Sequence, residues 1–91
     1  MNTREVFSLM LEREASDLYL RTKAQPRARI NGRVETLGGE PLSKSTMAAI
    51  TNHLLGNEDR RRKFAENLDI DFIYDEEGVG RFRINIFTQR G

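Results

Sequence analysis

The chain has 91 residues, of which 37% are hydrophobic and 32% charged, with a formal net charge of +1 and no cysteine. This length supports one small domain with a modest core rather than two lobes that close over a substrate. The balanced charge excludes a general electrostatic attraction to nucleic acid or membranes. The lack of cysteine excludes thiol chemistry and fits the cytoplasm. No apolar run approaches the ~20 residues of a membrane span.

The N-terminal part of the chain predicts a helix followed by a strand. Four apolar residues recur at helical spacing and form one stripe: Val6, Phe7, Met10 and Leu11. The next stretch, ASDLYLR, alternates instead, with Leu18 and Leu20 on one face and Tyr19 on the other. This change of period marks the passage from helix to strand.

The segment AQPRARINGRVETL predicts a β-hairpin. Ala28 and Ile30 alternate with arginines, and Asn31-Gly32 then supplies the two residues that adopt positive φ most readily. Val34 resumes the alternation. We therefore expect a two-residue turn between two short antiparallel strands.

The stretch LGGEPLSKST differs at one position from the sequence pattern of a phosphate-binding P-loop. Gly38 is followed by four residues and then by SKS at positions 43–45. A true P-loop has glycine where this chain has Ser43, since the backbone must wrap tightly around the phosphate there. It also follows a buried apolar strand, whereas RVETL is half polar. We expect Ser43 to cap a helix that runs to Leu55 and ends at Gly56.

The second half of the chain predicts a further helix and a second hairpin. Asn57 is a suitable cap for the helical stretch EDRRRKFAENL, and DIDFIYDEEGVGRFRINIF gives two alternating strands. The core face of these strands is expected to carry Ile70, Phe72, Tyr74, Phe82, Ile84 and Ile86. The order helix, strand, hairpin, two helices, hairpin predicts a single α+β domain over residues 1–91, with the helices packed on one face of an antiparallel twisted sheet.

Three polar features favour structural roles over chemistry. The basic run at 60–63 spreads around its helix beside acidic residues and lacks stacking aromatics, so nucleic acid is not an expected partner. Asp69 and Asp71 project to one strand face, but no nucleophile or oxyanion hole accompanies them. His53 is the single histidine and has no second ligand at metal spacing, so we expect no metal site.

The stretch GRFRINIF offers the best-placed binding groups. Arg81 and Arg83 are two residues apart on a strand, so both guanidinium groups emerge on one face, about 7 Å apart. Such paired forks suit phosphate or carboxylate binding, but the same pattern also fits two arginines that simply face solvent. Ile73 and Phe87 interrupt the alternation, which indicates that this polar face is partly covered.

Several stretches resemble, in order and spacing, the N-terminal domain of the type IV pilus retraction ATPases PilT and PilU, in the type II/IV secretion ATPase superfamily. They are EASDLYL, PRARINGRVETL, PLS at a helix start and RRKFAENLDIDFIY…GVGRFRINIFTQRG. The resemblance spans essentially the whole chain. SDLYL, INGRV and GRFRINIF are its more specific pieces.

The resemblance implies a PAS-like domain that precedes a RecA-like motor domain. In that family the Walker A loop, the acidic and histidine boxes and the catalytic carboxylate lie C-terminal to this segment, and none is present in this sequence. We therefore expect a non-catalytic fragment without a cofactor of its own. The resembled parent is an ATPase of twitching motility that uses ATP and magnesium.

The resemblance also implies a place in an assembly. The domain is expected to pack against motor domains of the same and neighbouring subunits in a cytoplasmic homo-hexamer, beside the inner-membrane pilus machinery. Arg81 and Arg83, with Arg90 at the linker, are the positions expected to contact nucleotide phosphates or a neighbouring subunit. The alternative function is a free-standing PAS-like sensor or adaptor, which would need an internal cavity with converging polar groups for a small ligand.

Overall fold

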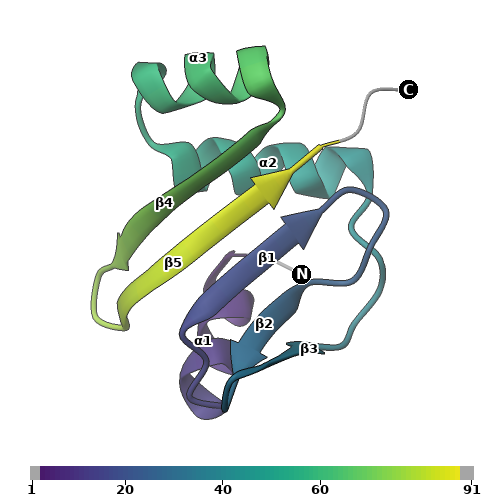
Figure 1. The fold of residues 1–91 in the computed structure, drawn as a ribbon, viewed down its shortest axis with the longest axis vertical. Helices are drawn as coiled ribbons and strands as arrows, with labels where there is room; N and C mark the ends of the chain where they lie inside the picture. Colours follow the sequence, from purple (N-terminus) through teal and green to yellow (C-terminus); the bar gives the residue numbers. More distant parts are fainter. Residues whose placement is uncertain (1–2, 89–91) are drawn as a thin grey trace.

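Three helices and five strands follow one another in the predicted order in the computed structural model, which describes residues 3–88 (Figure 1). They are α1 (Thr3–Glu12), β1 (Asp17–Arg21), β2 (Arg27–Ile30), β3 (Arg33–Thr36), α2 (Lys44–Leu55), α3 (Glu58–Asn67), β4 (Asp69–Glu76) and β5 (Gly80–Phe87). The α+β prediction is confirmed, and its more specific PAS-like label stays a prediction. None of the helices within residues 3–88 has the length and apolar character needed to cross a bilayer.

The five strands form one mixed sheet in the order β3-β2-β1-β5-β4. Three neighbouring pairs are antiparallel, whereas β1 and β5 run parallel, with Asp17 opposite Arg83 and Arg21 opposite Phe87. The prediction of an antiparallel sheet is therefore wrong at this central pair. The α2–α3 segment carries the chain back across the sheet, and such a helical crossover permits two strands to pair in the same direction.

The predicted turn of the first hairpin is confirmed. Asn31 has φ 51° and Gly32 has φ 79°, the two positive values that a tight two-residue turn requires. Ile30 then lies opposite Arg33. The alternation on β2 is also as predicted, because Ala28 and Ile30 are buried while the intervening arginine is exposed.

The stretch that resembles a P-loop is a turn followed by a capped helix, as predicted. The Ser43 side chain accepts a hydrogen bond from the Thr46 backbone N–H at 3.2 Å, which satisfies one of the free donors at the start of α2. Gly56 ends this helix with φ 69°. Asn57 caps α3 in the same way by accepting from the Arg60 N–H at 2.9 Å.

The core lies between the sheet and the helices, at one face of the sheet. Phe7 of α1 is fully buried, and its ring stacks on Phe82 at 5.0 Å and on Tyr74 at 5.4 Å between centroids. The predicted stripe of α1 is correct for three of its members, but Leu11 is 56% exposed. The prediction fails for Leu11 because this residue lies beyond the edge of the arc of about 100° that the buried Val6, Phe7 and Met10 span around the helix.

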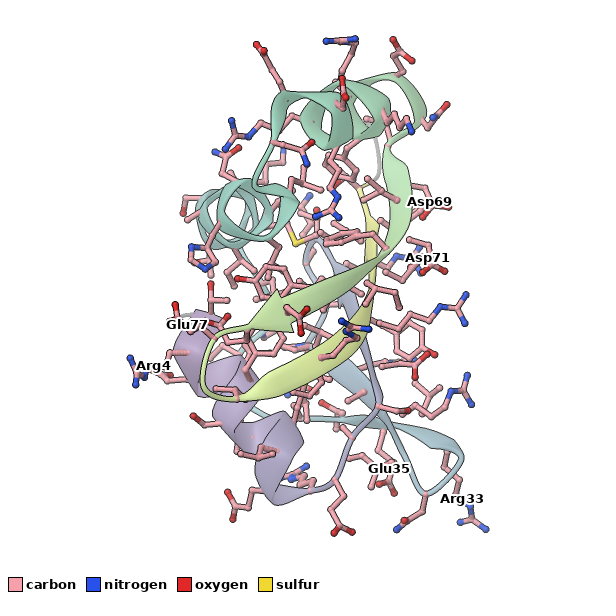
Figure 2. The ribbon with its side chains drawn as sticks, turned by 90° about the vertical axis from the view of Figure 1, so that its left-hand side faces the viewer. Arg4, Arg33, Glu35, Asp69, Asp71 and Glu77 are labelled. Atoms are coloured by element: carbon pink, nitrogen blue, oxygen red, sulfur yellow. The ribbon has the colours of Figure 1, made fainter. Side chains whose placement is uncertain are left out.

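Figure 2 shows that the helices cover one face of the sheet and leave the other face without a helix. We call this uncovered side the open face. It carries the side chains that alternate with the core residues along each strand. Any site built from rigid strand positions must therefore lie on this face or at an end of the sheet.

The packing around Phe7 leads to a first prediction. We expect Phe7→Ala to lower the free energy of unfolding by about 3–5 kcal/mol, because it leaves a cavity between α1, β4 and β5. The matched change Leu11→Ala is expected to alter it by less than about 0.5 kcal/mol, since that side chain faces solvent. Urea unfolding followed by circular dichroism measures both, and equal losses in the two variants would contradict the placement of α1.

Candidate functional site: the open face of the sheet

The open face brings together charged, polar and aromatic side chains with two exposed aliphatic ones, Val34 on β3 and Ile73 on β4. Register assigns its members, because residues directly opposite each other in a sheet share a face. They are Asp17, Tyr19, Arg21, Arg27, Arg29, Val34, Thr36, Asp69, Asp71, Ile73, Asp75, Arg81, Arg83, Asn85 and Phe87. Both arginines predicted on β5 are among them and both are exposed.

Arg83 is held by a carboxylate on the neighbouring strand. Its Nε donates to Asp71 Oδ1 at 3.0 Å and its Nη2 donates to Asp71 Oδ2 at 2.7 Å, a two-pronged ion pair. Asn85 is the residue directly opposite Asp71, so the pair runs diagonally across the ladder. The hydrogen bonds from Arg83 hold the pKa of Asp71 below its usual value, and the same contact raises the pKa of Arg83.

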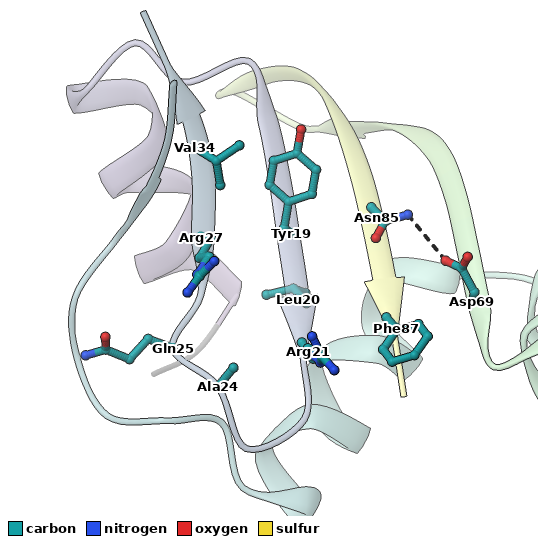
Figure 3. A pocket seen from close by; sticks show the side chains of 10 residues that line it. All are labelled: Tyr19, Leu20, Arg21, Ala24, Gln25, Arg27, Val34, Asp69, Asn85 and Phe87. Carbon is teal, nitrogen blue, oxygen red and sulfur yellow. Dashed lines mark hydrogen bonds between the residues drawn. The ribbon is translucent and has the colours of Figure 1, made fainter. Parts of the chain in front are cut away.

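The neighbouring polar groups of β4 and β5 pair in the same manner. Arg81 Nη2 lies 3.3 Å from Oδ2 of Asp75, the residue directly opposite. Asn85 Nδ2 donates to Asp69 Oδ1 at 3.3 Å, drawn as the dashed line in Figure 3. We call these three contacts the β4–β5 ladder. Each of its carboxylates has a donor on β5, so this half of the open face is largely self-neutralised.

Sequence reasoning placed Arg81 and Arg83 on one face but missed the carboxylates that meet them. The signal was present, since alternating aspartates on one strand of a hairpin and alternating arginines on the other indicate cross-strand pairs. Both arginines are exposed and each is paired with an aspartate, and their contact with phosphate or a neighbouring subunit stays a prediction. Arg90 lies outside the described residues.

The β1–β2 half of the open face has a different charge balance. Arg21 lies over the Phe87 ring at 5.1 Å, and Arg29 lies over Tyr19 at 6.0 Å and donates to its hydroxyl at 3.0 Å. Within residues 3–88 these two arginines form no ion pair with a carboxylate. Stacking of this kind orders guanidinium groups without neutralising them.

A shallow groove of about 470 Å³ lies between these residues (Figure 3). Its lining includes Tyr19, Arg21, Arg27, Val34 and Phe87. Figure 3 shows Tyr19 between Arg27 on one side and Asn85 on the other, so the aromatic ring forms part of the floor. The groove thus combines two arginines, the Asp69 carboxylate and two amide side chains with an apolar surface.

Apolar side chains are also exposed on this face. Among the described residues, three of the four large hydrophobic side chains that remain exposed lie there: Val34 at 46%, Ile73 at 53% and Phe87 at 36%. Arginine, tyrosine and phenylalanine are enriched in protein–protein interfaces, whereas a purely solvated sheet face is mostly polar. This composition supports the prediction that the face is partly covered, which stays a prediction.

Comparison with known proteins gives relatives of one kind. No protein-family model matches the chain. It is 36% identical over 90 residues to the type IV pilus ATPase PilU of Pseudomonas aeruginosa, and 33% identical over 89 residues to the type IV pilus retraction ATPase PilT of the same organism. These alignments cover 99% and 98% of this chain but 23% and 26% of those proteins.

A solved structure agrees with these relatives. The crystal structure of the pilus retraction motor PilT with bound ADP superimposes on the whole chain with a TM-score of 0.78 and 33% sequence identity. The chain covers 26% of that structure, so it spans about a quarter of the length of the proteins it matches. The predicted resemblance to the PilT and PilU retraction ATPases is therefore confirmed over the full chain.

The β4–β5 ladder leads to a second prediction. The pKa of Asp71, measured by NMR titration, is expected below that of an ordinary aspartate and to rise in Arg83→Gln, because the donors that stabilise its charged form are gone. Arg81→Gln is the matched control and should leave this pKa nearly unchanged. The same pKa of Asp71 in the wild type and in Arg83→Gln would contradict the ion pair between Asp71 and Arg83.

The sign of the pH effect on stability follows from this shift. Because the pKa of Asp71 is lower in the folded than in the unfolded chain, its contribution is complete above the unfolded value of about 4. The contribution is lost as the pH falls through the folded pKa. In Arg83→Gln the free energy of unfolding should therefore fall less steeply with acidification than in the wild type.

Proposed function

We propose that this chain is the non-catalytic N-terminal domain of a type IV pilus retraction ATPase. It couples ATP binding and hydrolysis in an adjoining motor domain to motion between domains and subunits of a homo-hexamer. The supporting observation is that the whole chain matches PilU and PilT while spanning about a quarter of their length. In this proposal ATP and magnesium bind the motor domain, and the assembly works in the cytoplasm beside the inner-membrane pilus machinery.

The open face is the surface that this function would use. A sheet closed by a packed core on one side moves as a rigid body, so a force applied to its free side is transmitted without local deformation. The exposed Val34, Ile73 and Phe87 supply apolar area, and the arginines of β1, β2 and β5 supply charge for orientation. Such a face suits a docking surface whose partner changes position during a nucleotide cycle.

The ladder gives Arg81 and Arg83 a way to sense that cycle. Exposed ion pairs are weak, so a phosphate or a carboxylate of another subunit can replace Asp71 or Asp75 as the partner of an arginine. Exchange between an internal and an external partner is a two-state element that one nucleotide state would favour. Together with Arg81 and Arg83, Arg90 is proposed to contact the motor domain.

This proposal predicts the behaviour of the longer protein that the parent gene would encode. That protein should hydrolyse ATP as an oligomer, whereas the 91-residue chain alone should not. Arg81→Gln combined with Arg83→Gln should reduce its ATPase rate roughly fivefold or more, the lower range of typical coupling between sites. Phosphate release and analytical ultracentrifugation measure the two properties, and Arg62→Gln on the exposed side of α3 is the control.

Different outcomes bear on different parts of the proposal. ATP turnover by the 91-residue chain itself, or a gene that encodes no motor domain after it, contradicts the function as a whole. An active oligomer whose double variant matches the wild type contradicts only the role of Arg81 and Arg83. In that case the cationic half around Arg21 and Arg27 becomes the surface to test.

A further inference from the structure

The two parallel strands end side by side in a groove away from the open-face groove. Arg21 and Phe87 are paired at the ends of β1 and β5, and the residues that follow them, Thr22 and Thr88, line a groove of about 480 Å³. Figure 1 shows both arrowheads directed toward α2. We call this the strand-end groove.

The walls of the strand-end groove are largely apolar. Four hydrophobic side chains from α2 and α3 line it: Met47, Ala48, Leu55 and Phe64. Met47 and Leu55 also belong to the buried core, so this wall is held rigidly. A hydrocarbon chain of a small molecule can lie against it and bury apolar area.

Two hydroxyl groups in the lining have no hydrogen-bond partner. Thr22 Oγ1 and Thr51 Oγ1 are both buried and unpaired, and Thr51 is the one polar residue counted as buried among the described residues, at 6% exposure. A buried hydroxyl without a partner destabilises a fold, and valine would fill the same space without that cost. Threonine on a helix adopts two side-chain rotamers. The Thr51 oxygen is shielded in this structure, so contact with a ligand in the groove requires the rotamer that turns the hydroxyl outward.

The charges at the rim of the groove have one sign. Lys44 lies in the first turn of α2 and Arg61 lies on α3, and no carboxylate side chain lines the groove. Within residues 3–88 Lys44 forms no ion pair, whereas Arg61 donates to the Asn52 carbonyl at 3.4 Å near the end of α2. The positive end of the α2 dipole adds to the field at Lys44.

We propose that the strand-end groove binds a small amphipathic anion. Its apolar chain lies on Met47, Leu55 and Phe64. Its carboxylate or phosphate group lies between the ends of the Lys44 and Thr51 side chains, two turns apart on α2, and accepts a hydrogen bond from the Thr51 hydroxyl. Binding supplies the partner that this hydroxyl lacks. The site does not depend on the proposed ATPase function, because it uses none of the open-face residues.

The test is an NMR titration of the ¹⁵N-labelled 91-residue chain with hexanoate at constant ionic strength. We expect saturable shifts at the amides of Thr22, Lys44 and Thr51. The neutral analogue 1-hexanol lacks the charge and acetate lacks the apolar chain. Each should therefore bind about tenfold more weakly than hexanoate, the effect of losing one favourable contact. Hexyl phosphate, which carries both features, should shift the same amides.

Two variants separate binding from structure. Thr51→Val keeps the shape of the side chain and removes the unpaired hydroxyl, so it should raise the thermal midpoint while weakening hexanoate binding about tenfold. Lys44→Gln should weaken binding of hexanoate but not of 1-hexanol. Lys63→Gln removes a lysine that does not line the groove and should leave both affinities unchanged.

Three results would overturn the proposal. The first is the absence of saturable shifts with hexanoate and hexyl phosphate. The second is equal affinity for hexanoate and 1-hexanol, which would make the groove a plain apolar surface. The third is unchanged hexanoate binding in both Thr51→Val and Lys44→Gln, which would place the ligand elsewhere. All three results come from the NMR titrations, and the spectrum of each variant also shows whether that variant is folded.

Discussion

The stacking of Phe7 between the helix layer and the sheet is the constraint on which the rest of the structure depends. This ring is fully buried against Tyr74 and Phe82, and it ties α1 to β4 and β5, which are more than sixty residues later in the chain. Because three short helices supply apolar area for only one side of five strands, the other side stays open. The open face is thus a consequence of the core rather than a separate feature.

The charges of the open face are unevenly distributed between its halves. On β4 and β5 they pair with one another, which keeps each arginine exposed yet occupied. On β1 and β2, Arg21 lies over the Phe87 ring and Arg29 over the Tyr19 ring, and neither has a carboxylate partner among the described residues. The β1–β2 half attracts an anionic partner, and that partner must displace Asp75 or Asp71 to engage Arg81 or Arg83. Electrostatic attraction and exchange of partners are therefore separate steps in the proposed coupling.

The two proposed surfaces share the rigid β1–β5 pair at the centre of the sheet. Phe87 contributes to the groove on the open face, and Thr88 immediately after it lines the strand-end groove. A ligand in the second groove would therefore contact the chain one residue from a surface proposed to dock another domain. Packed sheets transmit small displacements along their strands, so this adjacency is a physical route by which a small molecule could bias docking.

The amino-acid sequence by itself determined the elements, their faces and their ends. Alternation placed Leu18, Ile84 and Arg83 on the correct sides of their strands, and Asn31-Gly32 and Ser43 marked a turn and a helix start, because these signals depend only on neighbouring residues. The relationship to PilT and PilU was also readable, since its motifs are contiguous. Only the tertiary structure decided that β1 and β5 run parallel and that Leu11 faces solvent. Each of these depends on which distant segment comes to lie alongside, and local periodicity carries no information about that choice.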